Sequence, residues 1–345
     1  MVDWFLVACV LGGAMSFVGL CFLGTCVCVL LFLALIRFVI VPLDCDAVLK
    51  FHELFGKQPE SLKGKVVWIT GASSGIGAAL AVRLARAGAR LALSARSVEK
   101  LISVKQHCLG TGGVTEEQVV VVPLDLVQYD QHQAAFNTVL HHFGELDVLV
   151  NNAGRSQRGC WEEIHLDVDK ELFEVDVFST IALSRLVCKY FLEQGRCGHF
   201  AITSSVAGKF GVPMSGSYTA AKHALHGYFE CLRTEKLGRG LTISMVCPGP
   251  VVSGLDEAWF TEQQGKKLNE KRTGKMMSAE RCAELFAVTL ANHLPETWIA
   301  LQPVLLIMYI SQYMPGLSKS VMQLLPLSFI LKLRDGRADL TEPAK

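Results

Sequence analysis

The sequence predicts an α/β protein built on a doubly wound parallel sheet of about seven strands, with a membrane helix at its N-terminus. From Lys65 onward, short β-branched runs alternate with longer helical stretches, which is typical of βαβ units. The runs VVWIT and VVVVPL are continuously apolar, as strands covered on both faces are. The predicted strands span residues 66–70, 90–94, 119–124, 147–151, 199–204, 242–247 and 297–301.

The composition excludes several classes of protein. With 345 residues, the chain is long enough for one large α/β domain with additional segments. Hydrophobic residues make up 51% and charged residues only 19%, which excludes a disordered chain, a collagen and a coiled coil. The net charge of +1 offers no basic excess, so we expect no nucleic acid partner. The 12 cysteines form no C-x-x-C motif and no Cys/His cluster, which indicates reduced thiols and no metal site.

The N-terminal segment precedes the sheet. Residues 4–36 hold no charged residue and no histidine over 33 positions, which is longer than the roughly 20 residues that cross a bilayer. A cleaved signal peptide fits poorly, because Asp3 stands where a basic residue is usual and no A-x-A site follows. We predict one uncleaved span at residues 17–41, with a short hairpin broken at one of its glycines as the alternative. The basic residues after the span weakly favour a cytosolic body, which leaves the side of the membrane open.

The chain divides into four predicted parts. Residues 1–45 form the anchor, 46–63 a linker, 64–301 the α/β domain and 302–345 an apolar extension. Prolines interrupt the extension, so we do not predict a second span there. Two interpretations of the extension stay open: it lies in the bilayer interface and opens the pocket toward lipid, or it forms the contact of a homodimer.

A glycine-rich turn joins the first strand to the first helix of the domain. Residues 70–77 read TGASSGIG and are followed by AALAVRLARAGA, a good helix former. In such a turn, backbone N–H groups approach a pyrophosphate at the helix N-terminus, so the pattern indicates a Rossmann-type dinucleotide site. A tight turn without a ligand is the alternative, which the position between strand and helix disfavours. The expected cofactor contacts are Gly71, Ser73, Ser74, Gly75, Ile76 and Gly77.

The second strand ends at Ser94-Ala95-Arg96, where a dinucleotide fold meets the adenosine ribose. A carboxylate at this place binds the 2′-hydroxyl, whereas an arginine accommodates a 2′-phosphate. A solvated surface arginine is the alternative interpretation. Arg96 therefore predicts NADP(H) as the cofactor.

Three further motifs follow in order along the chain: NNAG at 151–154, Ser204-Ser205, and YTAAK at 218–222. Tyr218 and Lys222 are four residues apart and share one helix face. A cation beside a phenol stabilises the phenolate, which suits Tyr218 to proton transfer at neutral pH. A lone Tyr-x-x-x-Lys is common, but its position after the other motifs makes chance agreement negligible.

These motifs, with PGPVVS at 248–253, resemble the short-chain dehydrogenase/reductase family over residues 65–301. The resemblance implies that Tyr218 is the catalytic acid/base, Lys222 its partner and a nicotinamide-ribose ligand, and Ser205 the donor to the substrate carbonyl. The anchor, the spacing and the apolar C-terminus are most similar to the dehydrogenase/reductase member 7 subgroup, which implies the endoplasmic reticulum membrane as the location. Further cofactor contacts are implied for Asp125, Asn152 and Ser253.

One position departs from the family pattern. The family usually has an asparagine, which holds a relay water, where this chain has Asp176. An ionised aspartate only accepts hydrogen bonds, so Asp176 either orients the water or pairs with Lys222. We expect the relay to work almost unchanged, with a degraded enzyme as the alternative, and we count Asp176 among the catalytic residues.

The expected substrate pocket is apolar. Few charges that could hold a carboxylate or a phosphate lie between Ser205 and Tyr218 or after the PGPVVS motif, so we expect a bulky apolar carbonyl or alcohol. The family resemblance implies steroids, retinoids and lipophilic xenobiotics. The sequence thus predicts a membrane-anchored NADPH-dependent reductase, with a catalytically weak nucleotide-binding scaffold that regulates a membrane partner as the alternative. The expected substrate contacts are Phe210, Met214, Leu255 and Trp259.

Overall fold

The computed structural model describes residues 24–28, 37, 42–252, 260–261, 274–326 and 328–330. The chain divides into two units, residues 1–43 and 44–345, and the fold is that of the second unit. Most of the predicted span at 17–41 lies outside the described residues, and so do Ser253, Leu255 and Trp259. Of the helices in the described parts, none is both long enough and apolar enough to traverse a bilayer.

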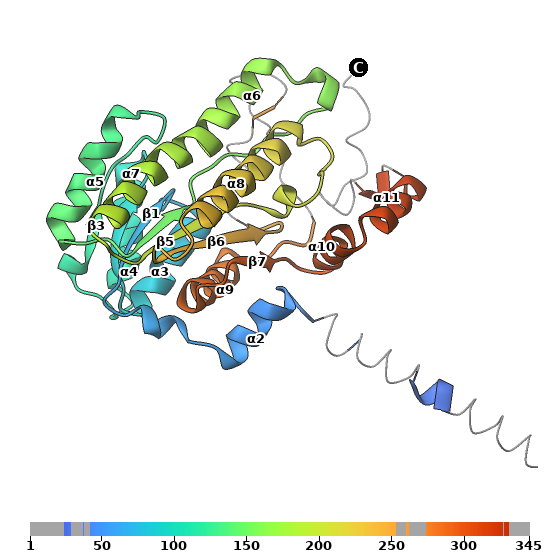
Figure 1. Ribbon diagram of the computed structural model, residues 1–345, viewed down its shortest axis with the longest axis horizontal. Coiled ribbons are helices and arrows are strands. Elements are labelled where there is room, and N and C mark those ends of the chain that lie inside the picture. Colours follow the sequence, from blue (N-terminus) through green and yellow to red (C-terminus); the bar gives the residue numbers. More distant parts are fainter. Residues whose placement is uncertain are drawn as a thin grey trace, which may run out of the picture. The chain divides into compact units, whose positions relative to one another are not determined.

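Seven parallel strands form one sheet in the order β3-β2-β1-β4-β5-β6-β7, which confirms the predicted doubly wound fold (Figure 1). The order reverses between β1 and β4, so the loops after these two strands open a crevice at the carboxyl edge of the sheet. The regular ladder of β3 ends at Val121, short of the predicted residue 124, because Pro123 has no N–H to donate. The strands are β1 Val66–Thr70, β2 Arg90–Ser94, β3 Val119–Val121, β4 Val148–Asn151, β5 Gly198–Thr203, β6 Leu241–Pro248 and β7 Glu296–Ile299.

Helices cover both faces of the sheet, which explains why every residue of β1 is buried. Val67 and Ile69 join a core with α3, α4 and α9, whereas Val66 and Trp68 join a second core with α5, α7 and α8. The π-helical turn η5 (Glu174–Phe178) connects α6 to α7. The helices of the domain are α3 Gly75–Arg86, α4 Val98–Leu109, α5 Asp130–Phe143, α6 Leu166–Phe173, α7 Ser179–Glu193, α8 Gly216–Glu235 and α9 Ala279–Asn292.

The segment predicted as a linker, residues 46–63, is folded onto the domain. It forms α2 (Ala47–Phe55) and η2 (Pro59–Leu62), which bury Leu49 and Leu62 in the core shared with α9. Asp46 fixes the start of α2, because its side chain accepts a hydrogen bond from the amide of Leu49 at 2.9 Å. These residues are therefore part of the folded unit rather than an open linker.

The predicted apolar extension forms two helices after β7, α10 (Val304–Tyr313) and α11 (Pro315–Leu324). Two hydrogen bonds fix α10 to the rest of the fold. Tyr309 accepts one from the first amide of α2 at 2.9 Å, and Gln312 donates one to the carbonyl of Lys209 at 2.7 Å. The extension is thus attached both to α2 and to the loop after β5.

Candidate active site

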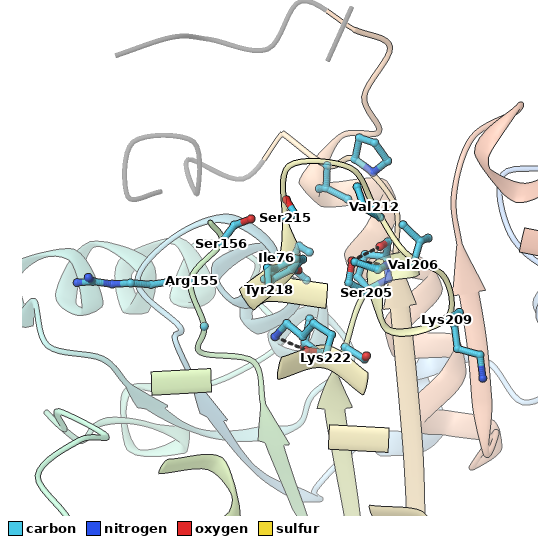
Figure 2. A pocket seen from close by; sticks show the side chains of 18 of the residues that line it. Ile76, Arg155, Ser156, Ser205, Val206, Lys209, Val212, Ser215, Tyr218 and Lys222 are labelled. Carbon is cyan, nitrogen blue, oxygen red and sulfur yellow. Dashed lines mark hydrogen bonds between the residues drawn. The ribbon is translucent and has the colours of Figure 1, made fainter. Parts of the chain in front are cut away.

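A cavity of about 1320 Å³ opens at the carboxyl edge of the sheet. Its walls come from the loops that follow β1 through β6 and from α10 and α11. Pockets of roughly 300–1,000 Å³ hold one ligand of drug size, so this cavity has room for a dinucleotide and a substrate together. Figure 2 shows a part of it, in which Ser205, Tyr218 and Lys222 gather in one region.

The N-terminus of α3 faces the cavity through Ser73, Ser74, Gly75 and Ile76. The side chain of the N-cap residue, Ser74, makes no capping hydrogen bond, and the first turn of α3 holds no acidic residue. The first backbone N–H groups of α3 are therefore left for a ligand, and the helix dipole favours an anion there. A pyrophosphate fits this set of donors.

Gly71 and Gly77 shape the turn in different ways. Gly71 lines the cavity with φ of +64°, and a Cβ on it would lie 2.7 Å from the Cα of Ala153. Gly77 lies outside the cavity wall and packs against Asn152, where any Cβ would collide with the side-chain amide. Gly77 therefore packs inside the turn, and its contact with the cofactor stays a prediction.

Asn152 ties together the ends of three neighbouring strands and lines the cavity. Its Nδ2 donates to the carbonyls of Thr70 and Gly71, both at 3.2 Å, and its Oδ1 accepts from the Thr203 hydroxyl at 3.2 Å. A side chain held by three hydrogen bonds cannot turn away from a ligand, so Asn152 gives the cofactor site a rigid floor.

Arg96 and Asp125 line the cavity where a dinucleotide would place its adenosine. Sequence reasoning missed Lys100, which lines the same region from the first turn of α4. Its signal was its position four residues after Arg96, on a helix whose N-cap is Ser97. The side chains of Arg96 and Lys100 are both exposed, so they can move to contact a phosphate without leaving a buried position in the protein.

The residues predicted to move the proton lie on α8 and on the loop after β5. Tyr218 and Lys222 both line the cavity from α8, and the Lys222 Nζ is 5.4 Å from the centre of the Tyr218 ring. Lys222 also donates to the carbonyl of Thr203 at 3.3 Å. The buried Ser205 hydroxyl accepts from the amide of Ala207 at 3.1 Å and donates to the carbonyl of Pro248 at 3.4 Å, a long hydrogen bond that a ligand oxygen can replace. The structure brings these predicted residues together in one place.

Asp176 lies directly behind Lys222 and is fully buried, with 0% of its surface exposed. Its Oδ2 is 3.0 Å from the Lys222 Nζ, and its Oδ1 accepts from the amide of Arg155 at 2.7 Å. Burial raises the pKa of Asp176, and Lys222 opposes this in part. Burial alone would lower the pKa of Lys222, but the Asp176 carboxylate turns the net shift upward and keeps the lysine charged. Asp176 lies outside the cavity wall and acts through Lys222, so it is a positioning residue.

The four predicted substrate residues differ in where the structure places them. Phe210 lines the cavity, between Ser205 and α8. Met214 lies outside the cavity wall; its φ is +55°, and its carbonyl accepts a hydrogen bond from the amide of Gly159. It shapes the loop before Tyr218, and its contact with the substrate stays a prediction. The other two predicted contacts are outside the described residues.

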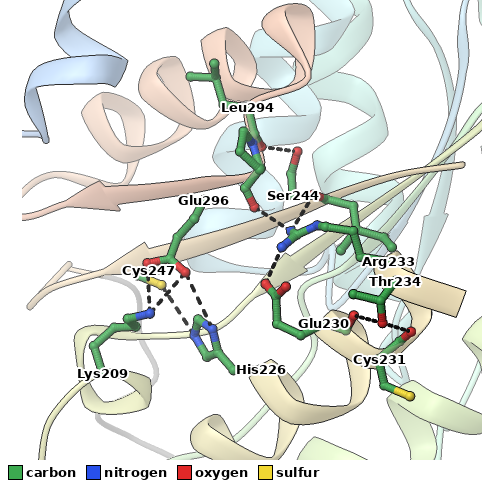
Figure 3. Close-up of polar contacts among 12 residues, drawn as sticks. Lys209, His226, Glu230, Cys231, Arg233, Thr234, Ser244, Cys247, Leu294 and Glu296 are labelled. Atoms are coloured by element: carbon green, nitrogen blue, oxygen red, sulfur yellow. Dashed lines mark hydrogen bonds and ion pairs between the residues drawn. The ribbon is translucent and has the colours of Figure 1, made fainter. Parts of the chain in front are cut away.

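Four further basic side chains line the cavity, contrary to the expectation of few charges: Arg155, Arg158, Lys209 and the exposed Lys319 of α11. Two of them have acidic partners, because Arg155 lies 3.8 Å from Glu171 and Lys209 lies 3.0 Å from Glu296 (Figure 3). Arg158 is buried and donates to a serine hydroxyl at 3.0 Å. Neutral pairs and engaged donors of this kind are compatible with an uncharged substrate.

Comparisons with known proteins agree with this geometry. The short chain dehydrogenase family model matches residues 65–264. The chain is 42% identical to "Dehydrogenase/reductase SDR family member 7" of Mus musculus, over 85% of this chain and 87% of that protein, and 41% identical to the Homo sapiens protein of that name, over 84% and 86%. A crystal structure of a short chain dehydrogenase/reductase from Burkholderia phymatum in complex with NAD has a TM-score of 0.63 at 26% identity, covering 74% of this chain and 96% of that one. The predicted likeness to family and subgroup is confirmed, and the chain belongs to the short-chain dehydrogenase/reductase family.

Proposed function

We propose that this protein is a membrane-anchored oxidoreductase that uses NADPH to reduce the carbonyl groups of lipophilic substrates. The observation that carries the proposal is the cavity that joins Ser205, Tyr218 and Lys222 to the uncapped N-terminus of α3 and to Arg96. Proton-transfer residues and an anion site that share one cavity are what a dinucleotide-dependent reductase needs.

The residues of the chain orient the substrate and transfer the proton, while a reduced nicotinamide, when bound, supplies a hydride to the carbonyl carbon. Ser205 donates a hydrogen bond to the carbonyl oxygen, and Tyr218 delivers the proton that turns this oxygen into a hydroxyl. The Lys222 ammonium stabilises the phenolate that remains. Lys222 keeps its place because Asp176 and the Thr203 carbonyl hold it at 3.0 and 3.3 Å. A proton from solvent then restores Tyr218.

The choice of NADPH over NADH is supported by Arg96 and Lys100, which can both meet a 2′-phosphate. The likeness to a protein in complex with NAD supports the dinucleotide class. The apolar residues of the substrate region support a lipophilic carbonyl compound, such as a steroid, a retinoid or a xenobiotic ketone or aldehyde. The uncharged run at 4–36 and the family resemblance support an anchor in the endoplasmic reticulum membrane.

A nucleotide-binding scaffold is the second candidate. The observation in its favour is the carboxylate of Asp176, which fixes the Lys222 ammonium where the family usually has a neutral amide. A bound lysine of this kind could hold a cofactor and yet support slow turnover.

The experiment that separates the two candidates uses the full chain in phosphatidylcholine nanodiscs. NADPH and NADH oxidation is followed against a panel of lipophilic ketones and aldehydes, with the Tyr218→Phe variant as control. We expect NADPH-dependent turnover of at least one lipophilic carbonyl, lost in the variant. NADPH binding without turnover across the panel would instead identify the scaffold, and absence of binding would overturn both candidates.

A further inference from the structure

The helices α10 and α11 form one wall of the cavity and also part of the outer surface. On their outer side, Leu306 of α10 is exposed, and Leu317 and Leu324 of α11 have 52% and 83% of their surface exposed. The residues of the pair that line the cavity include Ile307, Ile310, Ser318 and Met322.

The second helix of the pair, α11, is the more exposed of the two. None of its ten residues is buried. An isolated helix of this length is not stable in water, so packing must hold it. The surrounding sequence is nearly uncharged, because residues 297–331 contain a single charged residue, Lys319, in 35 positions. An apolar surrounding is therefore the environment that suits these helices.

A second exposed apolar strip lies on α2. Val48, Phe51 and Phe55 are exposed there, although a helix of a water-soluble domain normally turns such side chains inward. The amide of Ala47 donates to the Tyr309 hydroxyl at 2.9 Å, so α2 and α10 are neighbours, as Figure 1 shows. The two exposed apolar strips thus lie on helices that are in contact at the start of α2.

Aromatic side chains with polar tips mark the junction of the two strips. The Trp298 and Tyr309 ring centres are 5.1 Å apart, and those of Tyr309 and Tyr313 are 6.1 Å apart. Tryptophan and tyrosine are enriched at the boundary between membrane and water, where their rings lie at the level of the headgroups. Of these three residues, Tyr313 is 72% exposed and can take this place, whereas Trp298 is only 7% exposed and packs behind it.

We infer that α2, α10 and α11 form a docking surface for a lipid bilayer, and that lipophilic substrates pass from the lipid into the cavity beside α10 and α11. The inference of substrate entry rests on the proposed function. A bilayer is a better occupant than a second copy of the chain, because the uncharged run at 4–36 ends ten residues before α2, a reach of at most about 35 Å. The docking surface consists of Val48, Phe51, Phe55, Leu306, Tyr313, Leu317 and Leu324.

The docking surface is connected to the loop that carries the substrate residue Phe210. Gln312 of α10 donates to the Lys209 carbonyl at 2.7 Å, and the Lys209 ammonium lies 3.0 Å from Glu296 (Figure 3). Trp298 donates to the same carboxylate at 2.7 Å. A bilayer that holds α10 in place therefore also holds this loop, so docking and substrate binding are coupled.

A photo-crosslinking experiment tests the surface itself. Benzoylphenylalanine is introduced in place of Phe55, Leu317 or Leu324 in the full chain, which is reconstituted in phosphatidylcholine nanodiscs. Leu237 provides the matched control, because this leucine is 84% exposed but lies after α8, outside the docking surface. We expect lipid adducts at the three test positions and few at the control. Adducts between two protein chains in place of lipid adducts, or equal lipid adducts at all four positions, would overturn the inference.

A kinetic comparison tests the route of the substrate. The double variant Leu317→Glu/Leu324→Glu changes exposed side chains only, so the fold should persist, which the thermal midpoint with NADPH checks. Two carboxylates oppose insertion, so the KM for a lipid-dissolved ketone should rise by about tenfold while that for a water-soluble aldehyde and both kcat values stay unchanged. The Leu237→Glu variant should behave as wild type. Equal KM values in wild type and double variant would contradict entry from lipid, whereas lipid adducts without turnover of any carbonyl would overturn only the proposed function.

Discussion

Replacement of Asp176 by asparagine tests how the proton-transfer residues are held. In the wild type, one carboxylate oxygen lies 3.0 Å from the Lys222 Nζ and the other accepts from the Arg155 amide at 2.7 Å. An ion pair at this separation is worth about 5 kcal/mol at an effective dielectric constant of about 20, and burial of the two charges opposes part of that. Because the carboxylate raises the pKa of Lys222, its removal should make the lysine lose its proton at a lower pH.

Under the proposed function, ketone reduction uses the charged lysine beside Tyr218, so the alkaline limb of the pH–rate profile should move to lower pH in Asp176→Asn. The asparagine oxygen can still accept one of the two hydrogen bonds, so the rate at neutral pH should fall by less than the roughly 10²–10⁴-fold that general acid–base catalysis contributes. Asp176→Ala removes both acceptors and leaves a buried unpaired ammonium, which should destabilise the fold by about 3–5 kcal/mol.

The assay is the pH–rate profile of each variant with one ketone, together with its thermal unfolding midpoint. Asp46→Asn is the matched control, because Asp46 is also buried but caps α2 instead of facing Lys222. It should lower the midpoint and leave the alkaline limb in place. An unchanged limb in Asp176→Asn, or an equal movement in the control, would refute the role assigned to the ion pair.

Three further outcomes are expected. Arg96→Ala should reduce the preference for NADPH over NADH by about 10–100-fold, because a charge-assisted contact of about 1.5–3 kcal/mol is lost; a constant ratio of the two kcat/KM values would contradict this. Gly77→Ala should weaken NADPH binding and lower the thermal midpoint through its collision with Asn152, whereas Gly227→Ala, with open space around the added carbon, should not. Burial holds the pKa of His199 at about 3, whereas an unfolded histidine titrates near 6.5, so the unfolded chain binds more protons between these values. The free energy of unfolding should therefore fall by up to about 1.4 kcal/mol per pH unit as the pH drops from about 6.5, and denaturant titrations in which His199→Asn keeps the same slope would exclude this origin.

The sequence alone was sufficient to predict the strands of the sheet and the motif residues that follow them. The strands could be predicted because buried parallel strands are continuously apolar, and the motifs follow them at fixed edges. The pairing of Asp176 with Lys222 could only be offered as one of two alternatives, because it joins η5 to α8 across the fold. The same holds for Arg155 and Arg158, which no local pattern marks as cavity residues. The folded state of residues 46–63 was missed because α2 depends on tertiary contacts at Leu49.

The cavity wall formed by α10 and α11 was also beyond local reasoning. An apolar, proline-broken segment such as residues 302–330 gives no signal that distinguishes a pocket wall from a lipid or dimer contact. The structure shows that one helix pair lines the cavity with one side and exposes apolar residues on the other. Periodicity predicts two sides of a helix, but it does not say what each side meets.

The most direct test of the central claim is isotope transfer from the cofactor to the product. NADPH with deuterium at the reactive nicotinamide carbon is incubated with the full chain in nanodiscs and a lipophilic ketone, and the alcohol is analysed by mass spectrometry. The account predicts deuterium on the carbinol carbon with the wild type, and a loss of product of roughly 10²–10⁴-fold in Tyr218→Phe with NADPH binding retained. Alcohol without deuterium, or equal product from the wild type and from Tyr218→Phe, would contradict it.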